Sequence, residues 1–161
     1  NSQIRKIYDK MERNVLIMIA IPIPFFGFVY LNTENPIFFF EVPQLTGFWE
    51  YFGLGLVFTF LIAQYFAFQK DSKNIEKSSF GLEKKLEAYS KASFNRFRIL
   101  FVSGLVAAAG LFLFGNAGYT IAFAVTLVFF SAAKPTPERI IRALKLKGEE
   151  KDQIMGLKRR E

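Results

Sequence analysis

The side chains able to do acid–base or electrostatic chemistry in this sequence are its 14 carboxylates and its 21 lysines and arginines. The sequence contains no cysteine and no histidine. A thiolate nucleophile, iron–sulfur ligation, the usual zinc sites and histidine-based proton transfer are therefore excluded. The HExxH, P-loop and GxSxG motifs are also missing from it. We therefore predict a protein that is not an enzyme and that has no catalytic residues, cofactor or metal.

Three carboxylates stand apart from the remaining charges, at Glu34, Glu41 and Glu50. An enzyme working at a membrane interface through these carboxylates is one alternative, and a proton-carrying role for Glu50 is another. Glu50 falls in the first turn of an expected helix, where the helix dipole favours a negative charge. A solvated carboxylate at a helix start is the simpler interpretation.

The charged residues lie between or beside four apolar runs, which are expected to form the helices that position them. The runs cover residues 14–31, 48–68, 97–114 and 118–133. The chain is 161 residues long, is 52% hydrophobic and contains 21 phenylalanines. A helix of about 20 residues crosses a hydrocarbon core of roughly 30 Å, so the first three runs are long enough. The fourth run is slightly short and needs Lys134 to snorkel or the bilayer to thin. These runs predict an all-α fold, an integral membrane four-helix bundle.

The basic residues set the expected orientation of this bundle. All lysines and arginines lie before the first run, between the second and third up to Arg98 at the edge of the third, or after the fourth. The positive-inside rule then places both termini in the cytoplasm. The predicted cytoplasmic segments are 1–13, 69–96 and 134–161, and the predicted extracytoplasmic segments are 32–47 and 115–117. A multi-pass protein of the inner (plasma) membrane is the expected localisation.

The net charge of +7 suggests an acidic partner. The basic residues flank the apolar runs and do not form one patch, which favours the anionic inner leaflet over nucleic acid. The residues expected to contact anionic lipid are Arg13, Lys70, Arg96, Arg98, Lys134 and Arg139.

Small residues mark the expected helix-packing surfaces. Their spacing allows close approach of helices in a bilayer. The set comprises Gly53, Ser103, Gly104, Ala107 and Ala108.

Two prolines interrupt the first apolar run, at Pro22 and Pro24. Each removes a backbone donor and clashes with the preceding turn, so a kink is expected near residues 18–20. A hinge or a cavity wall is one interpretation, and a fixed bend that improves packing is the preferred one.

The segment between the first two runs is unusually apolar for a connection and too short to span a bilayer. It lies either in the membrane interface or against a partner protein, and the sequence does not separate these alternatives. The residues proposed for an external contact are Phe38, Phe39, Phe40, Glu41 and Trp49.

The cytoplasmic segments have their own helical patterns. Residues 1–13 are expected to continue helically into the first run, with one apolar face. Residues 69–79 are expected to form a polar, mobile loop, and residues 80–97 an amphipathic helix that enters the third run.

A further helix is expected after the fourth run. Thr136 suits its N-cap and Pro137 its first position. The charged tail that follows carries Ile154, Met155 and Leu157, which are expected to dock on a partner.

Several features from Leu82 onward occur together, and they cover the C-terminal half of the chain. They are Glu83-Lys84-Lys85-Leu86 with Tyr89 and Arg98, the Gly115-Asn116 turn, Pro135, Arg139-Ile140, Leu144 to Leu146 and Glu149-Glu150. In these features the chain resembles small four-span inner-membrane proteins of Bacteroidota-type bacteria that have no established activity. The resemblance implies the four-span architecture and no particular chemistry.

The expected function is therefore that of a non-catalytic accessory or scaffold subunit that packs against other membrane proteins or against itself. The alternative is a small transporter, or a protein that binds lipid or a neutral small molecule. Ionisable residues deep in a span usually mark ion pathways, and the four runs lack them.

Overall fold

The computed structural model describes residues 2–34 and 47–158, and these are all-α with no strand. The elements in chain order are α1 (Ser2–Ala20), α2 (Pro22–Glu34), α3 (Gly47–Lys77), α4 (Leu82–Phe114), α5 (Ala117–Ala133), α6 (Pro137–Leu144), α7 (Glu149–Met155) and a short 3-10 helix (Gly156–Lys158). The predicted all-α class is confirmed. Three helical stretches are long and apolar enough to cross a membrane: Gln3–Thr33, Gly47–Lys77 and Leu82–Phe114. Helices α5 and α6, bent by 82° at their junction, supply up to a fourth.

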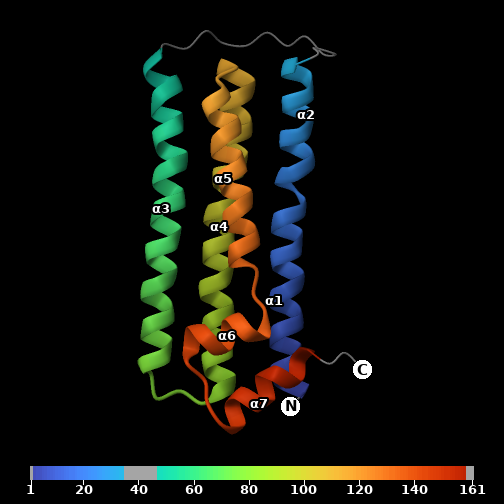
Figure 1. Ribbon diagram of the computed structural model, residues 1–161, viewed down its shortest axis with the longest axis vertical. Helices are drawn as coiled ribbons and strands as arrows, with labels where there is room; N and C mark the ends of the chain where they lie inside the picture. Colours follow the sequence, from blue (N-terminus) through green and yellow to red (C-terminus); the bar gives the residue numbers. More distant parts are fainter. Residues whose placement is uncertain (1, 35–46, 159–161) are drawn as a thin grey trace.

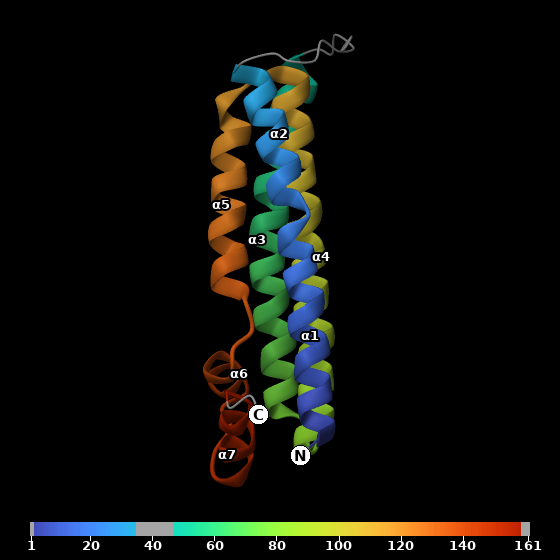
Figure 2. The ribbon, with the colours of Figure 1, turned by 90° about the vertical axis from the view of Figure 1, so that its right-hand side faces the viewer.

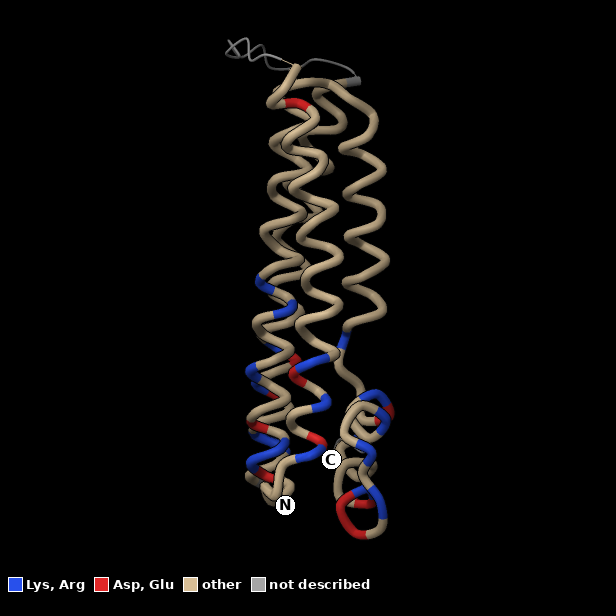
Figure 3. The backbone as a smooth tube through the Cα atoms, turned by 90° about the vertical axis from the view of Figure 1, so that its left-hand side faces the viewer, with Lys and Arg blue, Asp and Glu red and all other residues tan. Residues whose placement is uncertain are grey.

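The long helices lie side by side along one axis, with α1 and α2 forming a single rod (Figure 1). Helices α6 and α7 lie beyond the end of α5, beside the start of α1 (Figure 2). We call this end of the molecule the basal end and the opposite end the upper end. Lysines, arginines and acids gather at the basal end, whereas the upper lengths of the helices are nearly free of them (Figure 3).

The rod of α1 and α2 is interrupted at Ile21, immediately before Pro22. The Ile21 N–H still donates to the Ile17 carbonyl at 3.2 Å, so the break is local. Pro22 is buried, and its Cβ lies 3.3 Å from the place that a Cβ on Gly104 would occupy. Because the proline packs directly against α4, the interruption is held in place by its neighbour.

The polar segment after the second run is helical, which corrects the expected loop at residues 69–79. Helix α3 continues to Lys77, and only a short turn separates it from α4. Ser72 and Ile75 are buried on this extension. The extension is helical because its few buried residues pack against other helices, and this tertiary packing stabilises the helix. The polar composition of the segment does not predict such packing.

Two hydrophobic cores are stacked along the molecule. The upper core comprises Val15, Phe26, Val29, Val57, Leu61, Phe97, Leu100, Ala107, Ala108, Leu111, Tyr119, Ala122, Phe123, Phe130 and Ala133. The basal core comprises Ile4, Tyr8, Met11, Ile75, Leu86, Tyr89, Ala92, Ile140, Leu144, Leu146, Ile154 and Leu157. The apolar face expected for residues 1–13 therefore packs inside the protein, in the basal core.

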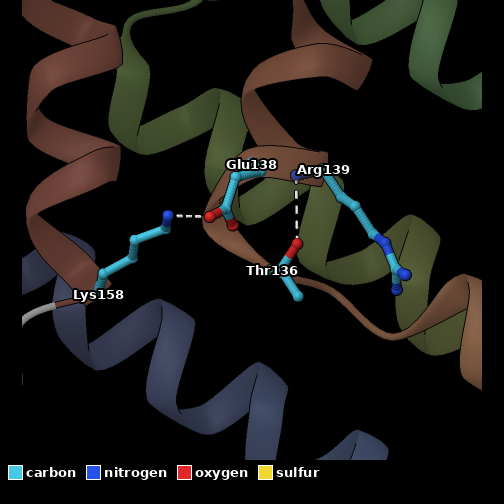
Figure 4. Close-up of polar contacts among 4 residues, drawn as sticks. All are labelled: Thr136, Glu138, Arg139 and Lys158. Carbon is cyan, nitrogen blue, oxygen red and sulfur yellow. Dashed lines mark hydrogen bonds and ion pairs between the residues drawn. The ribbon is translucent and has the colours of Figure 1, made fainter.

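Helix α6 begins as the sequence predicts. The N–H of Arg139 donates to the Thr136 hydroxyl oxygen at 3.2 Å, and Pro137 occupies the first turn (Figure 4). Lys158 forms an ion pair with Glu138 across the same region (Figure 4). The ion pair joins α6 to the 3-10 helix.

The tail after α6 folds back onto the chain itself. Ile154 is fully buried and Leu157 is 6% exposed, both within the basal core. Arg5 of α1 also donates to the Gly156 carbonyl at 3.2 Å. The expectation that these tail residues dock on a partner is therefore wrong for Ile154 and Leu157, because the basal core already covers them.

Candidate functional site

The level between the two cores contains a polar junction built around Arg96 of α4. Its Nε donates to Gln64 Oε1 at 2.9 Å, and its guanidinium lies over the Phe68 ring, 4.4 Å from the ring centre. Gln64 is fully buried and also donates from Nε2 to the Leu61 carbonyl at 2.8 Å. A buried amide costs free energy unless it is hydrogen-bonded. The bond from Arg96 therefore satisfies the buried oxygen of Gln64, and the same bond holds the Arg96 side chain in place.

A second arginine of the basal end closes the C-terminal end of α5. Nη1 of Arg139 donates to the carbonyls of Ser131 at 3.0 Å and Lys134 at 2.7 Å. The last carbonyls of a helix have no partner within the helix, and a cation is favoured beside them. Arg139 therefore fixes the bend between α5 and α6.

The residues predicted to contact anionic lipid separate into two groups. Arg13, Lys70, Arg98 and Lys134 are exposed at the basal end, and Arg139 is exposed while it bonds to α5. Arg96 is different, because it is half-buried and engaged by Gln64 and Phe68. The structure therefore gives Arg96 an internal role, and its contact with lipid stays a prediction.

The predicted packing residues lie at helix contacts of the upper core. Ser103, Gly104, Ala107 and Ala108 are all buried on α4. Gly53 of α3 lies against the Tyr119 ring of α5, where a Cβ would overlap the hydroxyl.

Gly110 is a packing residue that the predicted set omits. The ring of the fully buried Tyr119 lies directly against it, and a Cβ at this position would overlap the ring. The Tyr119 hydroxyl donates to the Glu50 carbonyl. Gly110 follows the small residues of α4 in the sequence, but the aromatic ring opposite it becomes evident only from the fold.

The upper end is closed by a polar contact between α3 and the turn before α5. Asn116 Nδ2 donates to Glu50 Oε1 at 2.9 Å, and Asn116 Oδ1 accepts from the Gly118 N–H at 2.7 Å. The turn itself uses Gly115 at φ 61° to end α4. Glu50 is therefore a half-buried structural anchor for this turn.

The predicted external contact is only partly visible. Phe38, Phe39, Phe40 and Glu41 lie outside the described residues. Trp49 is 49% exposed at the start of α3 and packs edge-on against Phe48, with 5.3 Å between the ring centres.

Several hollows open on the basal half of the molecule. One of about 830 Å³ lies along α1 and has both acidic and basic lining residues: Arg5, Asp9, Glu12, Arg13, Leu16, Ile17 and Ala20. A crevice of about 370 Å³ lies between α1 and α4, and a groove of about 400 Å³ lies between α3 and α4. The described residues contain no group of three or more acids that could hold a metal ion. The charged and apolar lining of these hollows suits a ligand that is held by ionic and apolar contacts.

Comparisons with protein families, with curated proteins and with solved structures each find no match to this chain.

Proposed function

We propose that this chain is a non-catalytic accessory or scaffold subunit of the inner (plasma) membrane, with four spans and both termini in the cytoplasm. The upper helices would pack against other membrane proteins or a second copy. The basal core would present a rigid helical module at the cytoplasmic surface.

The observation that carries this proposal is the exposed apolar surface of the upper half. Its side chains are large and would be unfavourable in water over so wide an area. They include Phe25, Phe28, Leu31, Phe48, Tyr51, Phe52, Ile62, Ile121 and Val128, each at least 40% exposed. Such a surface is suited to contact with the hydrocarbon of a bilayer or with an apolar helix of another protein.

The orientation can be tested because the chain has no cysteine of its own. Ser79→Cys lies in the turn between α3 and α4, and Ala117→Cys lies at the start of α5; both positions are exposed. A membrane-impermeant maleimide applied to intact spheroplasts should label Ala117→Cys and should leave Ser79→Cys unlabelled until the membrane is opened. The reverse pattern would invert the proposed topology.

The scaffold role can be tested by purification in mild detergent followed by mass spectrometry. Two differently tagged copies expressed together report self-association in the same experiment. Stoichiometric recovery of a second membrane protein, or of the second copy, supports the scaffold role. Recovery of the chain alone contradicts that role.

A lipid-binding protein is the second candidate function. It is favoured by two adjoining hollows, the crevice between α1 and α4, which three cations line, and the apolar groove between α3 and α4. A chain that purifies alone with bound lipid would support this candidate.

A further inference from the structure

One face of α4 points away from the rest of the bundle, between α1 on one side and α3 on the other. Its residues Lys91, Phe94, Arg98 and Val102 recur at helical spacing and are all exposed. Phe94 and Val102 are 41% and 40% exposed, which leaves apolar surface on both sides of Arg98. This face therefore alternates cationic and apolar groups across the level where the basal charges end.

The crevice between α1 and α4 is strongly basic. Its lining includes three cations and no carboxylate. The lining residues are Lys10, Asn14, Ser90, Lys91, Phe94, Asn95 and Arg98. Nη2 of Arg98 donates to Asn95 Oδ1 at 2.9 Å, which fixes the direction of the guanidinium. A guanidinium has five N–H donors, so this bond leaves further donors for an anion.

The groove between α3 and α4 has the opposite character. It is lined by Phe60, Ala63, Ile99 and Val102, with Arg98 as its charged member. Arg98 lines both hollows, so the basic crevice and the apolar groove meet at this residue. The groove leads from Arg98 toward the upper half of α4.

Two carboxylates lie near these cations and limit the surplus of positive charge. Glu87 lines the next crevice toward the basal end, together with Lys6, Lys10 and Lys91. Asp71 lines the hollow on the other side of Lys91. Neither carboxylate lines a hollow that contains Arg98, so neither offsets the positive charge within the two hollows that this residue lines.

We propose that these two hollows form one binding site for an anionic glycerophospholipid of the inner leaflet. The headgroup phosphate would occupy the crevice among Lys10, Lys91 and Arg98, and an acyl chain would lie in the groove along Phe60 and Val102. Charge complementarity selects the anionic headgroup, and basic residues near the inner leaflet favour such lipids. The inference rests on the proposed function, since it requires the basal end to face the cytoplasmic leaflet.

The test uses the full chain, stripped of lipid in detergent, with native mass spectrometry to count bound lipids. Phosphatidylglycerol and phosphatidylcholine with identical chains are the probes. Wild type should retain one phosphatidylglycerol in preference to phosphatidylcholine. The double variant Lys10→Gln/Arg98→Gln should bind phosphatidylglycerol at least tenfold more weakly.

The matched control is Lys73→Gln/Arg142→Gln, which removes two exposed cations of the basal end outside both hollows. It should change lipid affinity less than twofold. Equal losses in the two double variants, or equal binding of both lipids, would overturn the proposal. Circular dichroism and gel filtration of each variant confirm that the fold is unchanged.

A third variant separates a lipid from a free anion. Ala63→Trp fills the apolar groove and leaves the three cations intact, so it should weaken phosphatidylglycerol binding. Inorganic phosphate should compete poorly with the lipid in wild type. Competition by phosphate at similar concentration, with no effect of Ala63→Trp, would identify a simple anion site and contradict the lipid. Lipid binding measured in detergent does not depend on the orientation of the chain in a membrane. The labelling experiment can therefore contradict the proposed topology while the lipid measurement supports the site, and the reverse can also occur.

Discussion

The two halves of this molecule differ in their surfaces, although each has an apolar interior. In the upper half, Ile121 is 60% exposed and Ile62 is 59% exposed around the apolar upper core. In the basal half, Ile140 and Leu86 are fully buried, whereas neighbouring lysines and glutamates are exposed. One continuous set of helices therefore meets two different surroundings.

This difference indicates which forces hold each half. The basal core resembles that of a soluble bundle, where removal of apolar area from water supplies most of the stability. Helices surrounded by hydrocarbon gain little from that effect and rely on close contact between small residues. Substitutions that remove volume should matter most in the basal half, and substitutions that add volume should matter most in the upper half.

The largest effect is expected in the basal core. Ile140→Ala removes a fully buried side chain from the centre of that core. A cost of about 2–5 kcal/mol is typical of such a truncation. Hydrogen exchange of α6 and α7 should increase strongly while the upper lengths of α3 and α4 stay protected. Val128→Ala, at a residue 66% exposed on α5, is the control and should change little.

If Ile140→Ala increases hydrogen exchange equally in both halves, the two cores unfold as one cooperative unit. The basal core is then not an independently stable part of the molecule. If Val128→Ala is as damaging as Ile140→Ala, the exposed apolar surface of α5 is itself buried against a partner.

The next effect tests the upper half by adding volume. Gly110→Val places a branched side chain where the Tyr119 ring already lies. Overpacking of this kind costs about 1–3 kcal/mol and occasionally more. Gly55→Val is the control, because Gly55 has open space beside it. Gel filtration after heating in detergent measures the difference, and equal stability of the two variants would refute close packing at Gly110.

A smaller effect is expected at the junction between the cores. Arg96→Met leaves the buried Gln64 oxygen without its donor, which should cost about 1–3 kcal/mol. The double variant Gln64→Leu/Arg96→Met removes both partners and should recover most of the loss. Lys70→Met, at an exposed cation, is the control. A double variant as unstable as Arg96→Met would show that the arginine acts through groups other than Gln64.

The sequence predicts the upper half well because few residue types can occupy a span. The apolar runs, the Gly115-Asn116 turn and the break beside Pro22 all have strong local signals, and the helices follow them. The start of α6 at Thr136 and Pro137 is also local chemistry, and it is confirmed. Each of these features depends on residues that are neighbours in the chain.

The basal half was predicted less well because its structure depends on distant contacts. Residues 69–77 look like a polar loop until Ser72 and Ile75 are placed against the other basal helices. Arg96 looks like any interfacial cation until α3 brings Gln64 and Phe68 to it. The inward position of Ile154 likewise requires α7 to fold back, which no local pattern specifies.

The N-cap of α6 should give an effect of about 1 kcal/mol. Thr136→Ala removes the hydroxyl oxygen that accepts from the Arg139 N–H. Amide exchange in α6 should accelerate while α7 changes less. Ser131→Ala is the control, since only the backbone carbonyl of Ser131 is engaged by Arg139.

The smallest effect concerns the exposed ion pair that ties the 3-10 helix to α6. The hydrogen bond from the Lys158 side chain lowers the pKa of Glu138 from its ordinary value of 4.5. Because the folded-state pKa lies below the unfolded one, the pair stabilises the fold above pH 4.5 and loses this contribution as the pH falls through the folded-state value. Melting curves of wild type and Lys158→Gln should therefore differ slightly at neutral pH and converge in acid. A gap between the two curves that persists in acid would mean that Lys158 stabilises the tail through its aliphatic stem, so that packing outweighs charge even on the surface of the basal half.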